Sequence, residues 1–202
     1  MDTRHASRIK RLERFLPCLA CTACGSALTL GANAATCAGC SATYPVREGR
    51  LYFVTPPSRT DPLDDIKGRL KNWLGSYYYS VGVASLAPTY PLSMGREVRR
   101  HFDASQSLVV DAGCGNSRID KDVLCLDLFD YAEVDVVCDV TSLPFRDDCL
   151  DAILTRSVLE HLQYPFDTVR NFRRCTKPGG LGIHLVPFLY PFHASPHDFF
   201  RF

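Results

Sequence analysis

Residues 109–117 read VVDAGCGNS, a short apolar run followed by an acid and two glycines. The apolar run predicts a buried strand, and Gly113 and Gly115 predict a turn where the backbone can approach a ligand closely. A glycine-rich turn alone is a weak signal. A dinucleotide-binding fingerprint would need a third glycine where Arg118 stands and an acid about 20 residues further on, whereas Asp127 comes sooner. The turn therefore argues against a nicotinamide cofactor.

The chain around this turn alternates short apolar runs with turns and helical patterns. Strand candidates cover residues 107–111, 123–127, 134–138, 150–155 and 181–186. Their nearly continuous apolar character is typical of parallel strands that are buried on both faces. Phe166, Val169 and Phe172 recur at helical spacing and predict a helix between the last two strands. The pattern predicts an open α/β sheet, which binds ligands beyond the carboxyl ends of its strands.

Three acids stand at or just after the ends of predicted strands, namely Asp111, Asp127 and Asp139. Any one of them could simply cap a turn, but three in register favour a shared binding edge. With the glycine turn at residues 113–115, they resemble the S-adenosylmethionine (SAM) binding motifs of class I methyltransferases. This resemblance implies a Rossmann-like fold and SAM as the cofactor.

The resemblance to these enzymes, and to their type-11 group in particular, covers about residues 107–202 and includes the segment 150–162. It implies that Asp127 holds both ribose hydroxyls, that Asp139 contacts the adenine amino group and that Asp111 faces the methionine end. The cofactor-binding residues that it implies are Asp111, Ala112, Gly113, Cys114, Gly115, Asp127, Leu128, Asp139, Val140 and Ser157. No catalytic residue is assigned.

Two features depart from the family's pattern. Only seven residues separate Gly115 from Val123, so the usual first helix does not fit between the first two strands. The chain also stops at Phe202, in a segment that in relatives leads into another helix and two strands. We therefore expect a Rossmann-like parallel sheet that is truncated at its C-terminus, and the activity of this chain stays an open question.

Five of the ten cysteines crowd into residues 18–40, and the other five are scattered among apolar residues, as buried core thiols would be. The crowded stretch holds two CxxC pairs, Cys21 with Cys24 and Cys37 with Cys40. Two such knuckles can place four thiolates around a zinc ion. Cys18 offers a competing pair with Cys21, but Gly25 favours the first assignment because knuckles often need a residue that tolerates positive φ.

Four thiolate ligands would leave no open coordination position, so we expect a structural zinc ion. Together with Tyr44-Pro45-Val46-Arg47-Glu48-Gly49, the stretch resembles the small zinc-ribbon proteins that activate tRNA and protein methyltransferases, and the ribbons fused to some bacterial methyltransferases. This second resemblance covers about residues 19–53. It leaves a protein partner bound through the ribbon as an open alternative.

Prolines and polar residues after position 55 mark a boundary. We expect a zinc-ribbon module at residues 1–57, a helical linker or lid at 58–104 and an incomplete SAM-binding domain at 105–202. Ile66, Leu70, Trp73 and Leu74 predict an amphipathic helix in the linker, followed by tyrosines 77–79, and a further helix is expected over residues 96–102. The basic N-terminus is expected to be frayed and solvated, rather than a helix with one cationic face.

The composition is that of a soluble globular protein with a formal net charge of +1, which does not predict a polyanionic partner. No apolar run could span a membrane and no secretory signal is present, so we expect a cytoplasmic location. The leading hypothesis is a SAM-dependent methyltransferase with a small-molecule acceptor and without a nucleic-acid or membrane partner.

Two alternatives stay open, an RNA methyltransferase and a non-catalytic SAM-binding scaffold that recruits a partner enzyme. Residues 19–54 hold only Arg47 and Arg50 as cations, which argues against RNA binding by the ribbon. A general base is needed only if the acceptor atom carries a proton of high pKa. His161 is a candidate base, although a structural role is favoured, and His184, His193 and His197 are further candidates.

Overall fold

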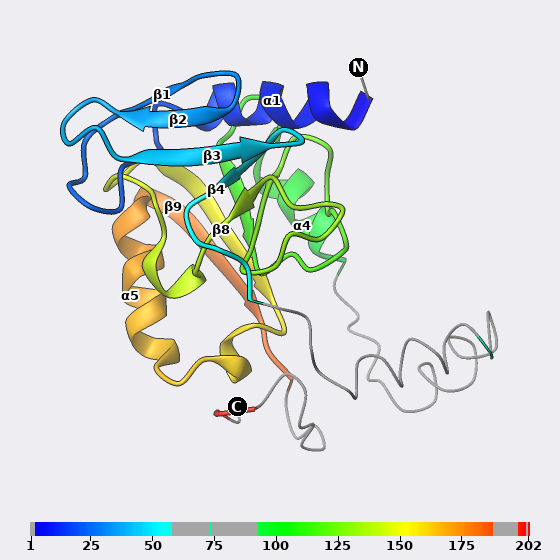
Figure 1. Ribbon diagram of the computed structural model, residues 1–202. Helices are drawn as coiled ribbons and strands as arrows, with labels where there is room; N and C mark the ends of the chain where they lie inside the picture. Colours follow the sequence, from blue (N-terminus) through cyan, green and yellow to red (C-terminus); the bar gives the residue numbers. More distant parts are fainter. Residues whose placement is uncertain (1–2, 58–72, 74–92, 188–197, 201) are drawn as a thin grey trace.

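The computed structural model describes residues 3–57, 73, 93–187, 198–200 and 202 of the chain. Its centre is a nine-stranded sheet with the spatial order β1-β2-β3-β4-β7-β6-β5-β8-β9 (Figure 1). The C-terminal strands are β5 (Val109–Ala112), β6 (Leu124–Asp127), β7 (Val136–Val137), β8 (Leu150–Arg156) and β9 (Thr176–Leu185). These five strands are parallel to one another, as their apolar character predicts. The predicted α/β fold with a Rossmann-like parallel sheet is therefore confirmed.

Along the chain, the five parallel strands lie in the spatial order third, second, first, fourth, fifth, which is that of doubly wound folds. The strand that the sequence placed at residues 181–186 begins earlier, at Thr176, because the turn with Gly179 and Gly180 is drawn into the strand. No helix connects β5 to β6 within the described segment 113–123, as the short spacing predicts.

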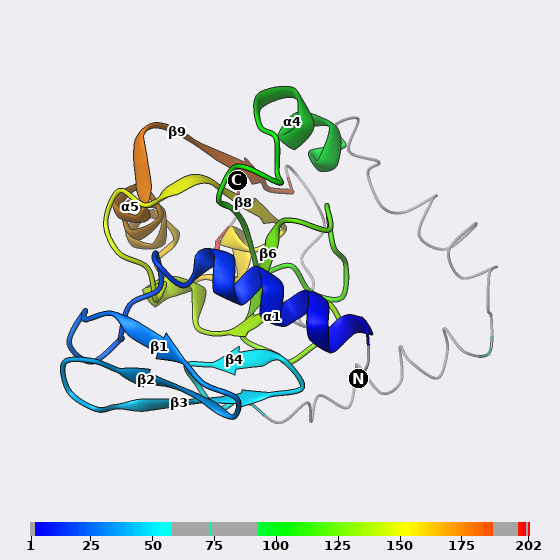
Figure 2. The same ribbon diagram turned by 90° about the horizontal axis from the view of Figure 1, so that it is seen from above.

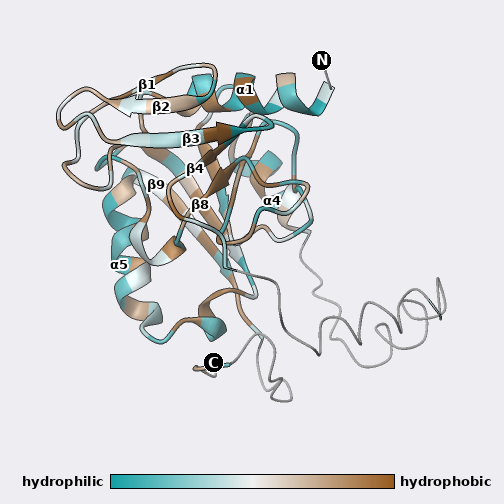
Figure 3. Ribbon diagram, viewed as in Figure 1, coloured by the Kyte–Doolittle hydropathy of each residue, from teal (hydrophilic) through white to brown (hydrophobic). Residues whose placement is uncertain are grey.

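Helices α4 (Met94–His101) and α5 (Pro165–Cys175) cover opposite faces of the parallel strands (Figure 2). Val98 of α4 packs in a core cluster with Val109, whereas Phe172 of α5 packs in another cluster with Val110. Because successive strand residues point to opposite faces, these contacts place the two helices on different sides of β5. The strands between the two helices supply much of the hydrophobic core, and Figure 3 colours the ribbon by hydropathy.

The N-terminal strands extend the same sheet. Strands β1 (Leu28–Leu30), β2 (Ala34–Cys37), β3 (Thr43–Arg47) and β4 (Arg50–Tyr52) form an antiparallel meander. Strand β4 then pairs in parallel with β7, with Leu51 opposite Val136. The backbone N–H of Phe53 continues this ladder by donating to the carbonyl of Val137 at 2.8 Å. The cysteine-rich region is thus joined to the parallel sheet by main-chain hydrogen bonds.

The expectation of a frayed N-terminus is wrong for the described residues, which form helix α1 (Thr3–Phe15). Leu12 and Phe15 have no exposed surface. Arg11 donates from Nε and Nη2 to the carboxylate of Asp135 at 3.0 and 2.7 Å. The sequence alone suggests a solvated charge at Arg11 because its acceptor, Asp135, lies 124 residues further along the chain.

The predicted linker helix, except Trp73, and the tyrosines at 77–79 lie outside the described residues, as do His193 and His197. The helix expected over residues 96–102 is confirmed as α4, two residues earlier at its start. None of the helices in the described part of the chain is both long and apolar enough to cross a membrane.

Candidate functional site

The glycine turn follows β5 and lies beside the end of β6. Gly113 and Gly115 have φ angles of +79° and +59°, a region that favours glycine. The backbone N–H groups of Gly113 and Cys114 both donate to the carbonyl of Leu126, at 2.9 and 3.0 Å. A Cβ atom on Gly113 would overlap the side chain of Val158, which follows β8. The turn therefore needs glycine at position 113 for two independent reasons.

Asp127, at the end of β6, is fixed against this turn. Its Oδ2 accepts a hydrogen bond from the N–H of Gly115 at 2.8 Å, and its Oδ1 accepts one from Phe129 at 3.0 Å. Only 9% of the residue is exposed. The carboxylate is therefore held at the carboxyl edge of the sheet in a fixed orientation.

Asp139 follows β7 and is exposed to solvent. Its Oδ1 accepts from the N–H and the hydroxyl of Thr141, at 2.8 and 2.7 Å, and so caps the short 3₁₀ helix η2 (Val140–Ser142). The N–H of Cys138 donates to the carbonyl of Asp127 at 2.9 Å. Asp139 thus lies one strand away from Asp127 along the same edge, while also serving as a cap.

Asp111 lies within β5 and is completely buried. Burial raises the pKa of this carboxyl group to about 6, against the opposing effect of the nearby Arg156 guanidinium. Nη2 of Arg156, at the end of β8, donates to Oδ2 of Asp111 at 2.9 Å. The other oxygen, Oδ1, has no hydrogen-bond partner among the described residues. Buried carboxylate oxygens are rarely left unpaired, so this atom marks a place where a donor could bind.

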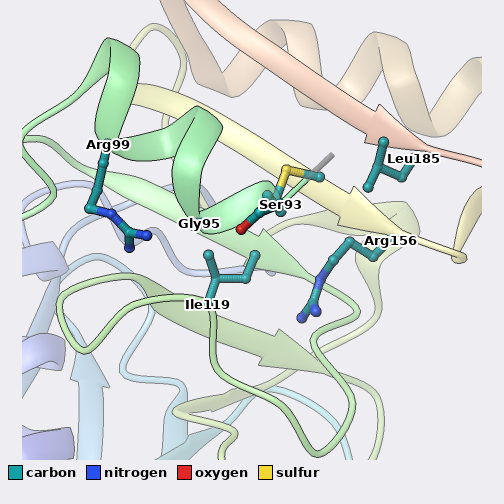
Figure 4. Close-up of a pocket in the computed structure, with 7 residues that line it drawn as sticks. Ser93, Gly95, Arg99, Ile119, Arg156 and Leu185 are labelled. Carbon is teal, nitrogen blue, oxygen red and sulfur yellow. The ribbon is translucent and has the colours of Figure 1, made fainter. Parts of the chain in front are cut away.

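Arg156 was not among the residues proposed from the sequence. It directly follows an apolar strand, where an arginine is easily interpreted as a solvated charge. A pocket of about 370 Å³ adjoins it, lined also by Ser93, Met94, Gly95, Arg99, Ile119 and Leu185 (Figure 4). The pocket is therefore formed by α4, the loop after β5, and the ends of β8 and β9.

The remaining candidates lie along the same edge with different exposures. Ala112 and Cys114 are buried, Val140 is buried, and Leu128 is 37% exposed. Ser157 is exposed and adopts a positive φ of 50°. The residues proposed from the sequence therefore converge on the carboxyl ends of β5, β6, β7 and β8.

His161 lies in the short helix η3 (Leu159–His161), which follows β8. Its Nδ1 is 3.2 Å from Oδ1 of Asp198, and its Nε2 is 3.9 Å from Oε1 of Glu160. The imidazole is thus held between two carboxylates. His184 instead shares a 2.9 Å hydrogen bond with the hydroxyl of Thr155 and stacks on Phe172, and burial lowers its pKa. This environment is that of a packed structural histidine.

The four predicted zinc ligands meet at one point between the knuckles. The sulfur atoms of Cys21, Cys24, Cys37 and Cys40 all lie within 4.8 Å of one another. Sγ of Cys21 is 3.6 Å from that of Cys40, and Sγ of Cys24 is 3.4 Å from that of Cys37. Four sulfurs that each lie about 2.3 Å from a zinc ion in a tetrahedron would be about 3.8 Å apart. The donor set therefore fits a zinc ion.

The competing assignment of Cys18 as a ligand is not supported, because its sulfur donates to the carbonyl of Cys149 instead. Gly25 has the positive φ expected after the first knuckle, at 75°. The Tyr44 hydroxyl lies 3.1 Å from Sγ of Cys21, and this hydrogen bond lowers the pKa of that thiol to about 6. The site therefore favours a thiolate at Cys21.

The parallel strands and the edge residues coincide with a known domain. Residues 110–183 match the family described as Methyltransferase domain. The match runs from β5 into β9 and so includes the glycine turn, Asp127, Asp139 and Arg156. No curated protein sequence matches the chain.

Solved structures with similar folds include several proteins of the methyltransferase type. A candidate methyltransferase from Bacillus halodurans is 18% identical, with a TM-score of 0.39, and the alignment covers 46% of this chain and 50% of that one. The YcgJ protein from Bacillus subtilis is 19% identical, with a TM-score of 0.42 and coverages of 48% and 50%. The chain thus spans about half the length of these two proteins. A third, the Burkholderia thailandensis 1,6-didemethyltoxoflavin-N1-methyltransferase, is 17% identical, with a TM-score of 0.34 and coverages of 77% and 70%.

Proposed function

We propose that the chain binds SAM along the carboxyl edge of β5, β6 and β7 and transfers its methyl group to a small-molecule acceptor. The observation that carries the proposal is the convergence of Asp111, the glycine turn and Asp127 at one edge, within residues that match the methyltransferase domain family. Bound SAM would supply an electrophilic methyl group on a sulfonium, so the protein has mainly to orient the acceptor and exclude water.

The edge residues fit the parts of this cofactor. Asp127 is fixed at the edge by the bonds from Gly115 and Phe129, and its carboxylate would accept from a ribose diol. Oδ1 of Asp111 would accept from the ammonium group of the methionine end. Gly113 allows the backbone to approach the ligand without a side chain. Asp139 would lie nearest the adenine, as its position after β7 suggests.

Other features favour a small acceptor over RNA. Of the two ribbon arginines, Arg50 is paired with Glu48 at 2.7 Å, and the Arg47 guanidinium lies 5.6 Å from the Tyr52 ring centroid. Two cations, one of them paired with a carboxylate, are few for a phosphate backbone. Strand β4 of the ribbon is paired with β7 of the same chain, which favours a role within this enzyme over recruitment of another methyltransferase.

Calorimetric titration with S-adenosylhomocysteine (SAH) tests the binding step. We expect binding by the unsubstituted chain and a loss of affinity of roughly 10- to 100-fold in Asp127→Asn, since the variant loses charge-assisted hydrogen bonds. Glu13→Gln, an exposed charge on α1, is the matched control and should bind normally. SAH binding without SAH production in the presence of SAM and a panel of small acceptors would favour the scaffold alternative. Absence of SAH binding would contradict the proposal.

A further inference from the structure

The ion pair between Asp111 and Arg156 uses only part of each partner. Arginine and carboxylate groups often pair through two parallel hydrogen bonds. Here Nη2 of Arg156 donates one hydrogen bond to Asp111, and the same nitrogen also donates to the carbonyl and the hydroxyl of Ser117, at 3.2 and 3.0 Å. The ion pair is therefore held by one hydrogen bond, and other polar atoms of both side chains do not take part in it.

Two of these atoms are buried and lack partners among the described residues, namely Oδ1 of Asp111 and Nε of Arg156. One is an anionic acceptor and the other is a cationic donor. Buried groups of this kind are costly to leave without a hydrogen bond. A ligand with a donor and an acceptor close together would satisfy both, and the strongest bonds would come from a cationic donor and an anionic acceptor.

An α-amino acid zwitterion has this combination, because its ammonium and carboxylate groups are attached to the same carbon atom. The positions of Asp111 and Arg156 in the fold also suit such a ligand. Asp111 pairs with Leu154 in the parallel ladder, two residues before Arg156, and both charged residues lie beside the glycine turn. The adjoining pocket has apolar walls from Met94, Ile119 and Leu185, which could accommodate an aliphatic chain.

We infer that Arg156 is a cofactor-binding residue that holds the carboxylate of the amino-acid end of SAM or SAH, while Oδ1 of Asp111 accepts from its ammonium group. Without ligand, Arg156 neutralises the buried carboxylate. With ligand, the same guanidinium pairs with the second anion, and the ammonium group shares the charge of Asp111. Arg156 therefore discriminates between adenosyl ligands with and without a carboxylate. This inference rests on the proposed function.

Arg100 provides a control guanidinium outside this pocket. It lies on α4, whereas Arg156 lies at the end of β8. Its side chain is 63% exposed and pairs with Glu97 at 3.1 Å. A general effect of removing a guanidinium would appear in Arg100→Gln, whereas a specific role in holding the ligand carboxylate would not.

The test is a calorimetric comparison of two ligands, SAH and 5′-(3-aminopropylthio)-5′-deoxyadenosine, which keeps the ammonium group and lacks the carboxylate. We expect the unsubstituted chain and Arg100→Gln to bind SAH roughly 10- to 100-fold more tightly than the amine. In Arg156→Gln this preference should fall to within about threefold. Arg156→Lys keeps a positive charge beside Asp111 and so serves as a second variant if the glutamine variant does not fold. It should show a reduced preference for SAH over the amine, because lysine lacks the planar fork of arginine.

An unchanged preference for SAH in both Arg156 variants, or tighter SAH binding after the arginine is removed, overturns the inference and leaves the proposed function intact. The second result would mean that Arg156 blocks the site. Failure of the unsubstituted chain to bind either ligand overturns both the inference and the proposed function.

Discussion

Replacement of Asp135 by alanine is expected to destabilise the whole fold, because this carboxylate joins α1 to the loop that carries the glycine turn. Asp135 has no exposed surface. It accepts hydrogen bonds from Arg11 at 2.7 and 3.0 Å, from Arg118 at 3.1 Å to each oxygen, and from the N–H of Cys125 at 3.0 Å. Removing it would leave Arg11 without this anion and Arg118 with Glu133 alone, at 3.0 Å.

The magnitude follows from the burial of the three side chains. Arg11 and Arg118 are 12% and 14% exposed, so water can solvate them only in part after the anion is lost. Breaking a buried ion pair by removal of one partner costs about 3–5 kcal/mol. Because both arginines keep some exposure, we expect a loss near the lower end, about 3 kcal/mol of unfolding free energy.

Urea denaturation followed by circular dichroism measures this loss. The control is the triple variant Arg11→Met, Asp135→Leu, Arg118→Met, which removes all three charges and should be much closer to the unsubstituted protein. A loss below about 1 kcal/mol in Asp135→Ala would contradict this prediction, since an ion pair of that strength is typical of the protein surface. An equal loss in the triple variant would show that packing, rather than charge pairing, is responsible.

Three further outcomes are expected. Burial raises the pKa of Asp111 from 3.8 to about 6, so the unsubstituted protein should lose stability relative to Asp111→Asn as the pH rises through this interval, by about 3 kcal/mol. The affinity of the unsubstituted protein for SAH should rise over the same pH interval, because the ammonium group of the ligand needs the ionised carboxylate. If the unsubstituted protein and Asp111→Asn differed in urea midpoint and SAH affinity by the same amount at every pH, this prediction would be contradicted. Gly113→Ala should abolish SAH binding or folding, because its Cβ would overlap Val158. Gly115→Ala has open space around its Cβ and should lower the unfolding free energy by only about 1 kcal/mol, because of its positive φ. Equal effects of the two variants in thermal melts and SAH titrations would argue against a tight turn. The purified chain should hold one zinc ion by mass spectrometry, and chelation or Cys37→Ser should lower its melting temperature by several degrees; a metal-free protein with an unchanged melting temperature would exclude a structural zinc.

The parallel strands could be predicted from the sequence because strands that are buried on both faces have nearly continuous apolar runs. The edge residues followed from the same pattern, since carboxyl ends of parallel strands meet at one edge. Gly113 and Asp127 are joined there through the turn, as expected. The cysteine register was also predictable, because positive φ after a knuckle favours the glycine at position 25.

Interactions between distant segments could not be predicted in this way. Helix α1 is fixed by arginines whose acceptors, such as Asp135, are far away in the sequence. The pairing of β4 with β7 involves short strands, and nothing local in residues 50–52 specifies a parallel neighbour. Arg156 could not be singled out from the sequence, because its contact with Asp111 and the unpaired oxygen of that carboxylate are visible only in the folded chain.

A crystal structure of the chain grown with SAH would show where the cofactor binds. We predict the ribose hydroxyls within hydrogen-bond distance of Asp127 and the amino-acid end between Asp111 and Arg156. SAH bound at any other surface, or a saturating concentration that leaves this edge empty, would contradict it.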